Sequence, residues 1–520
     1  MGVASVWGFA LVGIDAVPVR VEAHARNGLP GVTIVGLPGA AVREARERIR
    51  SGAASSGLAL PTQRITINLS PGDVPKDGPG FDLPVALATL AACGHLPVEC
   101  VRDVGAVGEV SLEGVVRPTR GMVSVAEAAS KIGVGLLLTP MEGLPAAVEV
   151  SAMPVAGVRT LAEAVMVVRD QGCRERVLER GARWLRARAD GAPALGEAPD
   201  LADVVGNHQA KRALEIVAAG GHHLLMVGSP GSGKTMLARR LAGILPPLTR
   251  EEAVDVTRVW NAAGLQSAQA GLATDRPFRA PHHTASRAAL VGGGATLRPG
   301  EVSLAHRGVL FLDELPEFSR DALEALRQPL EEGRVIISRR CGTSMFPAAC
   351  TLVAAMNPCP CGYLGHLDKA CRCQAIAVER YRARISGPLL DRVDVLIEVP
   401  ALTLTALEEP ARAERSAIVR QRVAAAREFR RERLQRSPET PGLPEGKAAW
   451  SLEDRSLLTA DARRLLRQAL VRESLSGRAY VRIISLARTI ADLDGDLPVT
   501  ADHLAEALAL RLDHRRIGFG

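Results

Sequence analysis

Aromatic residues are scarce in this sequence, and it has no long uninterrupted apolar segment. Phenylalanine, tryptophan and tyrosine make up 3% of the 520 residues, so the cores must be built mainly from valine, leucine, isoleucine and alanine. No uncharged apolar run approaches the roughly 18 residues that a transmembrane helix needs. The apolar N-terminal stretch lacks basic residues and is interrupted by Asp15, which indicates a buried strand rather than a signal peptide. We therefore expect a cytoplasmic protein with no membrane partner.

The sequence also lacks a strong excess of charge of either sign. Charged residues make up 23% and hydrophobic residues 47%, the composition of a folded rather than a disordered chain. The formal net charge is +7, and nearly all of the cations are arginine. An excess this small for the chain length favours an anionic partner such as nucleic acid only weakly. Composition alone therefore leaves the partner open.

The chain is too long for one ordinary core, and its length suggests about three domains. In residues 1–165, short runs rich in valine and isoleucine alternate with alanine-rich helical stretches. Residues 166–199 are predicted to be a linker that contains an arginine-rich helix. Residues 200–400 alternate buried strands with helices, which is typical of a parallel sheet, and residues 401–520 are predicted to be helical. The prediction is a multidomain α/β protein.

A glycine-rich segment lies between a short apolar run, residues 223–227, and a helix-forming segment, residues 236–242. The order strand, loop, helix is the context that the pattern GxxxxGKT requires. Backbone N–H groups of such a loop converge on phosphates, Lys234 reaches the β- and γ-phosphates, and the Thr235 hydroxyl ligates Mg²⁺. The residues predicted to bind ATP here are Gly228, Ser229, Pro230, Gly231, Ser232, Gly233, Lys234 and Thr235.

Two further apolar runs end in polar residues suited to ATP hydrolysis. The run 308–312 is followed by Asp313 and Glu314, and the run 351–356 is followed by Asn357. Asp313 is predicted to hold the Mg²⁺ shell, and Glu314 to activate the attacking water. Asn357 is suited to positioning that water. A pair of carboxylates after a strand is common, but its place downstream of the phosphate-binding loop makes the combination specific.

Three arginines are candidates for contacts with the γ-phosphate. Arg392 lies on a turn before the apolar run 395–399, from which it could project into the ATP site of a neighbouring subunit and offset transition-state charge. The alternative for Arg392 is a surface salt bridge. In the helical C-terminal region, either Arg478 or Arg482 could reach the γ-phosphate from a lid, and we favour Arg478.

Cysteines are concentrated in one segment: six of the nine lie between Cys341 and Cys373. An odd, clustered count argues against a disulfide framework. Four thiolates on one loop can close a tetrahedral Zn²⁺ site, a structural clip beside the ATP site, with His366 as a substitute ligand. The alternative is a set of reduced structural cysteines. The four candidate ligands are Cys359, Cys361, Cys371 and Cys373.

These motifs, in this order, resemble the magnesium-chelatase-like branch of the AAA+ superfamily, and within it the ComM/YifB-type group. That resemblance implies an AAA+ ATPase core with a C-terminal helical lid, assembled as a homo-hexameric ring. It further implies movement on single-stranded or branched DNA, with helicase or branch-migration activity during natural transformation. The segments that carry the resemblance are 276–286, 299–318, 357–362 and 381–392.

The resemblance also implies insertions that face the pore of the ring. The segment 291–300 is glycine-rich, as expected of a moving loop. The segment 334–345 is predicted to form a hairpin ending in Arg339 and Arg340, which could contact DNA phosphates without reading sequence. The alternative is a solvated hairpin tip.

Two N-terminal segments, 75–84 and 107–118, resemble the proteolytic domain of Lon-type proteases. Hydrolysis of that type needs a serine nucleophile activated by a lysine. Gly80 stands at the serine position and Val123 falls near the lysine position, so neither residue can take part in proton transfer. Residues 1–165 are therefore predicted to be a Lon-protease-like α+β domain without the catalytic dyad, either DNA-binding or ring-organising.

Three functions compete on these grounds. The first is an ATP-driven DNA motor that acts in integration of transforming DNA by homologous recombination. The second is a magnesium-chelatase-like or MoxR-like remodeller of a protein partner, which would use the same ATPase. The third, an ATP-dependent protease, is disfavoured because the residues of the dyad are missing.

Overall fold

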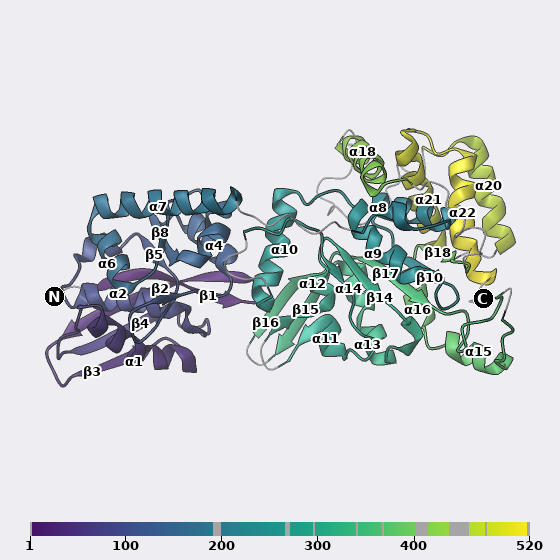
Figure 1. The fold of residues 1–520 in the computed structure, drawn as a ribbon. Coiled ribbons are helices and arrows are strands. Elements are labelled where there is room, and N and C mark those ends of the chain that lie inside the picture. The colour runs from purple at the N-terminus through teal and green to yellow at the C-terminus, as the bar shows by residue number, and fades with distance from the viewer. Residues whose placement is uncertain are drawn as a thin grey trace. The chain divides into compact units, whose positions relative to one another are not determined.

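The computed structural model describes most of the chain and divides it into two compact units (Figure 1). The first unit contains Met1–Ala194, Arg250–Ala273 and Ile336–Phe346. The second unit contains Leu195–Thr249, Thr274–Val335 and Pro347–Gly520. The described residues are 3–190, 199–265, 271–294, 297–339, 342–366, 369–401, 414–435, 457–473 and 476–516. None of the helices in these ranges is both long and apolar enough to cross a membrane.

The first unit is built on a mixed sheet of seven strands in the order β3-β4-β2-β1-β5-β8-β9. The apolar N-terminal stretch forms its strand β1, so the prediction of a buried strand there is confirmed. β1 pairs antiparallel with β2 through a turn at Gly13, whose positive φ of 66° favours glycine. The strands are β1 (Ala4–Val12), β2 (Asp15–Arg26), β3 (Gly31–Val35), β4 (Arg64–Ser70), β5 (Val104–Ala106), β8 (Leu136–Pro140) and β9 (Val155–Val158).

Seven helices accompany this sheet. The central one, α2, is buried at every residue because it packs across β1 and β2 with leucine, valine and alanine side chains. Within residues 166–199, predicted to be a linker, the chain is helical as far as Asp190. The helices are α1 (Ala40–Ser55), α2 (Asp82–Ala92), α3 (Val98–Val101), α4 (Met122–Ile132), α5 (Leu144–Val150), α6 (Leu161–Arg169) and α7 (Gln171–Asp190), and the strands β6 (Glu109–Val110) and β7 (Val116–Arg117) form a separate pair.

One helix of the first unit comes from the range 200–400. This helix, α10 (Arg250–Ala263), packs against α4. Its Arg258 forms ion pairs with Asp15 and with Glu127, where the distance is 3.4 Å, and Val254 joins the apolar cluster around Met122. The sequence between the phosphate-binding loop and Asp313 therefore contributes a helix to the N-terminal core.

The second unit contains a five-stranded sheet in the order β11-β14-β17-β10-β18, and every neighbouring pair is parallel. The predicted parallel sheet is confirmed. Its central strands are apolar and buried along their length, because helices cover parallel sheets on both faces. The carboxyl ends of such strands share one edge, where ligands bind. The strands are β10 (Leu224–Val227), β11 (Phe278–Arg279), β14 (Val309–Leu312), β17 (Thr351–Met356) and β18 (Val395–Glu398).

The segments that precede and connect these strands contain helices and two hairpins, and most of one hairpin, Ile336–Phe346, belongs to the first unit. The predicted hairpin is present as β15 (Arg334–Arg339) and β16 (Gly342–Pro347), and β12 (Gly292–Gly293) pairs antiparallel with β13 (Arg298–Pro299). Arg340 and the side chain of Arg339 lie outside the described residues. The helices are α8 (His208–Gly220), α9 (Lys234–Ile244), α11 (Arg287–Val291), α12 (Glu301–Leu304), α13 (Arg320–Ala325), α14 (Arg327–Glu332), α15 (Ala375–Arg382) and α16 (Gly387–Leu390).

The described part of residues 401–520 consists mainly of four helices, drawn in green to yellow in Figure 1. α21 packs against α18 and α22, and α20 packs against α22. Their apolar faces join one core with β10, β17 and β18, so these helices and the parallel sheet share a hydrophobic cluster. The helices are α18 (Ser416–Gln435), α20 (Ala460–Glu473), α21 (Gly477–Asp494) and α22 (Ala501–Arg516).

Candidate nucleotide site and cysteine cluster

The glycine-rich loop connects the end of β10 to the start of α9, as the sequence predicts. Gly231 and Gly233 have φ values of 80° and 92°, which favour glycine at both positions. A Cβ atom on Gly228 would lie 2.3 Å from the carbonyl oxygen of Val399, so only glycine fits between the loop and the end of β18. The loop leads into the N-terminus of α9, where free N–H groups and the helix dipole favour an anion.

Lys234 is the first residue of α9, and its side chain lies across the loop. Its ammonium donates hydrogen bonds to the carbonyl oxygens of Gly228 at 2.8 Å and Ser229 at 2.9 Å, and to Asn357 Oδ1 at 3.4 Å. Burial lowers the pKa of Lys234, and the carboxylate of Asp313 partly offsets that effect. The loop, Lys234 and Asn357 therefore form one constellation.

Thr235 and Asp313 come together beside this lysine. The Thr235 hydroxyl donates a hydrogen bond of 2.7 Å to Asp313 Oδ2, and the backbone N–H of Glu314 donates to Asp313 Oδ1 at 2.9 Å. The pairing arises because α9 starts after β10 while Asp313 follows β14, and both strands end at the same edge of the sheet. A hydroxyl and a carboxylate oxygen at a phosphate-binding loop are hard donors that suit Mg²⁺. The residues present therefore fit this ion.

Glu314 holds a strained backbone conformation next to a histidine that the sequence did not single out. Its φ of 52° places a non-glycine residue in the left-handed region, which costs on the order of 1 kcal/mol or more and must be offset by its surroundings. His283 Nδ1 lies 3.2 Å from Glu314 Oε2, and the ring of His282 lies 4.1 Å from that of His283. The signal in the sequence is a histidine pair shortly after the short strand β11, which pairs with β14.

Asn357 follows β17 and is fixed from two directions. Its side chain accepts from Lys234, and its backbone is hydrogen-bonded to the phenolic group of Tyr381 on α15. Burial raises the pKa of Tyr381 to about 12, so this phenol stays protonated. The prediction placed Asn357 near Lys234 and the structure brings them together, but Tyr381 was not foreseen.

Arg392 contacts helix α14 of its own chain. Its Nε donates to the carbonyl oxygen of Arg327 at 3.0 Å, Nη1 donates to Pro388 O at 2.6 Å, and Nη2 forms an ion pair with Glu331. Its side chain is only 12% exposed. Among the described contacts of Arg392, none is with the phosphate-binding loop. The geometry thus agrees with the salt-bridge alternative within one chain and leaves a role toward a second chain as a proposal.

The two arginines at the start of α21 differ in their surroundings. Arg482 forms an ion pair with Asp394, whose carboxylate also accepts from the backbone N–H of His223 at 2.9 Å. Burial raises the pKa of Asp394, but the hydrogen bond from His222 and the charge of Arg482 outweigh it, so the pKa is well below its usual range. Arg478 is 68% exposed and lies 3.9 Å from Asp391. Arg482 is held in an ion pair with Asp394, whereas the largely exposed Arg478 side chain remains the candidate for a contact with the γ-phosphate.

We therefore expect Arg478→Ala to affect ATP hydrolysis and Arg482→Ala to affect the stability of the fold. Arg478→Ala should lower the rate of ATP hydrolysis with little change in thermal unfolding. Arg482→Ala should lower the free energy of unfolding by about 2 kcal/mol at neutral pH, because it removes a partner of a largely buried carboxylate. Since a depressed acid pKa stabilises the fold above the unfolded pKa, the stability difference between wild type and Arg482→Ala should shrink as the pH falls through the acidic range. Equal unfolding curves for both variants would contradict the assignment.

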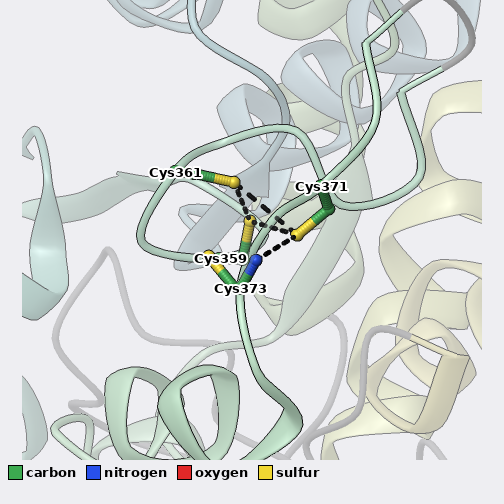
Figure 2. Close-up of side chains that lie close together, drawn as sticks. All are labelled: Cys359, Cys361, Cys371 and Cys373. Carbon is green, nitrogen blue, oxygen red and sulfur yellow. Dashed lines mark hydrogen bonds between the residues drawn. The ribbon is translucent and has the colours of Figure 1, made fainter.

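The four predicted cysteine ligands converge at the loop that follows β17 (Figure 2). Cys359 Sγ lies 3.4 Å from Cys361 Sγ and 3.6 Å from Cys371 Sγ, and the Sγ atoms of Cys361 and Cys371 are 3.6 Å apart. All four sulfurs, including that of Cys373, lie within 4.8 Å of one another, so the group could hold a metal ion. His366 stands outside the group and instead accepts from the backbone N–H of Lys369 at 3.2 Å.

Comparisons with known proteins identify relatives over nearly the whole chain. The family described as magnesium chelatase, subunit ChlI, matches residues 200–407, and two further ChlI descriptions match residues 21–143 and 413–511. The chain is 42% identical over 513 residues to protein YifB of Salmonella typhimurium, covering 98% of this chain and 97% of that protein. It is also 42% identical over 521 residues to competence protein ComM of Haemophilus influenzae, covering 98% of both chains.

A further similarity covers only part of the chain. The chain is 36% identical over 135 residues to a Lon protease of Chloroflexus aurantiacus, which covers 24% of this chain and 16% of that protein. At the position expected for the nucleophile, a Cβ on Gly80 would contact the side chain of Val107 at 3.3 Å. Val123, near the expected lysine position, is fully buried on α4. Neither residue offers the proton-transfer group of a serine–lysine dyad.

Proposed function

This chain belongs to the ComM/YifB-type group of the magnesium-chelatase-like family, and on that premise we propose that it is an ATP-driven hexameric DNA motor. The proposed motor is a helicase or branch-migration translocase that acts in integration of transforming DNA by homologous recombination. Family membership indicates ATPase activity, with ATP and Mg²⁺ as cofactors. The observation that carries the proposal is the convergence of Lys234, Thr235 and Asp313 at the carboxyl edge of the parallel sheet.

The chemistry follows from the roles that these side chains suit. The loop N–H groups and Lys234 would bind the phosphates, and Thr235 with Asp313 would hold Mg²⁺, which neutralises charge on the β- and γ-phosphate oxygens. Glu314, 53% exposed at the end of β14, would accept a proton from the water that attacks the γ-phosphorus. The bond to the bridging oxygen then breaks and ADP leaves. Asn357 would orient the water or the γ-phosphate, and an exposed Arg478 could act from the helical lid.

Two observations support DNA as the partner. The Haemophilus relative is named a competence protein, and that name points to uptake and integration of DNA. The chain carries a net charge of +7, and its sequence places Arg339 and Arg340 between the described parts of β15 and β16, where two cations would suit phosphate contacts independent of base sequence.

The expected result is that DNA stimulates ATP hydrolysis several-fold. Single-stranded, duplex, forked and four-way DNA should be compared at equal nucleotide concentration, with phosphate release as the measurement. The stimulation should fall steeply as salt rises, since each phosphate contact releases counterions. Mass photometry with ATP should show a hexamer. A hexamer whose ATPase is indifferent to every DNA would refute the motor proposal.

The family name favours one other candidate, a remodeller of a protein partner related to the magnesium chelatase subunit. That function would use the same ATP site but predicts stimulation by a specific protein and none by DNA. Capture of one stoichiometric protein partner that raises the ATPase rate of the purified chain would support it. Under either function, the missing dyad at Gly80 and Val123 predicts no cleavage of casein in the presence of ATP.

A further inference from the structure

We propose that the four-cysteine cluster binds one structural zinc ion, and that this ion holds the water-positioning Asn357 and the phosphate-binding loop in their active arrangement. The first part of the proposal concerns metal binding alone. The second part rests on the proposed ATPase function. The four ligands are Cys359, Cys361, Cys371 and Cys373.

The spacing of the sulfurs matches a single tetrahedral ion. Four ligands at a Zn–S distance of about 2.3 Å place the sulfurs about 3.8 Å apart. Three observed separations are 3.4, 3.6 and 3.6 Å, and the largest in the group is within 4.8 Å. Sulfurs this close cannot surround a multi-iron cluster. A site with four thiolates favours zinc over a single ferrous ion, because divalent zinc binds more tightly.

The loop supplies what a zinc–thiolate centre needs around it. A zinc ion with four thiolates carries a net charge of −2. Arg382 interacts electrostatically with Cys359, and Arg372 lies between two of the ligands in the sequence. Backbone N–H groups also point at the sulfurs, including that of Cys373, which donates to Cys371 Sγ at 3.4 Å. Four protein ligands leave no open coordination position, so the site is structural rather than catalytic.

The cluster ties together two ends of one connection in the chain. Cys359 and Cys361 lie just after β17, while Cys371 and Cys373 lie just before α15. A metal ion bound by all four cysteines would therefore hold the start of α15 close to Asn357, the residue that follows β17. Tyr381 on α15 is hydrogen-bonded to the backbone of Asn357, and Arg382 donates to the carbonyl of Pro358 at 3.2 Å. Metal binding would therefore fix the backbone on both sides of Asn357.

The same loop supports the phosphate-binding loop directly. Gly362, the residue after Cys361, has a φ of 83°, and a Cβ atom there would lie 2.6 Å from Pro230 Cδ and 3.8 Å from Asn357 Cγ. This close approach leaves no room for a larger residue. Pro230 belongs to the phosphate-binding loop, so the cysteine loop braces that loop on one side and Asn357 on the other. Release of the metal would free both contacts at once.

The test uses the full-length protein and measures metal first. Elemental analysis of protein purified without chelator should give one zinc ion per chain, and X-ray absorption should show sulfur as the only ligand type. Cys361→Ser and Cys371→Ser should each reduce the zinc content to background, while Cys100→Ser, a partly buried cysteine of the first unit, should keep it. Wild-type protein without zinc, or with iron in its place, would overturn the metal assignment.

A second measurement tests the positioning role. Zinc-depleted wild type and Cys371→Ser should hydrolyse ATP about tenfold more slowly or worse, because small displacements of positioning groups are costly in rate. Zinc should restore the depleted wild type, and Cys100→Ser should retain wild-type hydrolysis. Binding of a fluorescent ATP analogue and thermal unfolding separate loss of positioning from loss of the fold. Unchanged hydrolysis after complete zinc removal would overturn the positioning role, whereas absence of ATPase in zinc-loaded wild type would refute the proposed function instead.

Discussion

Replacing Glu314 by glutamine is expected to lower the rate of ATP hydrolysis about 10³-fold, while ATP binding stays close to that of the wild type. The amide cannot accept the proton of the attacking water, yet it is nearly the same size as the carboxylate. The phosphate-binding contacts of Lys234 and the Thr235–Asp313 pair do not involve the Glu314 side chain. Phosphate release and equilibrium binding of a fluorescent ATP analogue measure the two quantities separately.

The matched control for this change is Asp321→Asn. Asp321 is a nearby carboxylate, 72% exposed, that forms a 3.7 Å surface pair with Arg287. Its neutralisation removes the same unit of charge without touching the proposed water-activating group, so hydrolysis should remain near the wild-type rate. If Glu314→Gln kept wild-type turnover, Glu314 would not be the general base. Equal losses in both variants would point to net charge rather than to proton transfer.

Arg392→Ala is expected to lower hydrolysis on the order of 10³-fold, provided that Arg392 acts on the ATP site of a neighbouring subunit. Loss of a positive charge near the γ-phosphate raises the barrier for its transfer, whereas ATP binding should be nearly retained. Arg384→Ala is the control, because Arg384 is a half-exposed arginine that pairs with Glu317 at 2.7 Å. Steady-state phosphate release on assembled protein is the measurement.

A mixing experiment distinguishes action across subunits from a structural role. Arg392 binds the carbonyl of Arg327 and pairs with Glu331, so its loss could disturb α14 and lower activity indirectly. Arg392→Ala and Glu314→Gln chains, each inactive alone, should regain part of the activity when they assemble together. In such a ring, some sites combine an intact Glu314 with an intact Arg392 from the next chain. Mixed rings without recovery, together with lowered thermal stability of Arg392→Ala, would show that Arg392 only supports its own fold.

Local sequence patterns predicted the parts of the site that depend on short-range geometry. A strand, a glycine-rich loop and a helix in succession place Lys234 and Thr235 at a helix start wherever the rest of the chain lies. Polar residues directly after buried parallel strands meet at one edge of the sheet, so Asp313 and Asn357 could be placed near the loop before the strand order was known. The spacing of the four cysteines similarly predicted a cluster on one connection.

Contacts between distant segments depended on the tertiary structure. The sequence does not indicate that β10 lies between β17 and β18, because apolar parallel strands have similar patterns and their order depends on how the connections pack. Likewise, α10 has an amphipathic pattern that predicts a helix, but not that it packs on α4 and pairs with Asp15. An apolar stripe requires a partner surface without specifying which one.

The glycine-rich loop and the residues proposed to bind ATP were thus determined by the sequence itself, since backbone turns and helix starts are local properties. The tertiary structure decided which groups act beside them. It placed His283 next to the Glu314 carboxylate, paired Arg482 with Asp394 and brought the Tyr381 phenol to the backbone of Asn357. The partners in each pair lie at least 24 residues apart in the sequence, and they meet only because strand order and helix packing bring two otherwise ordinary polar groups together.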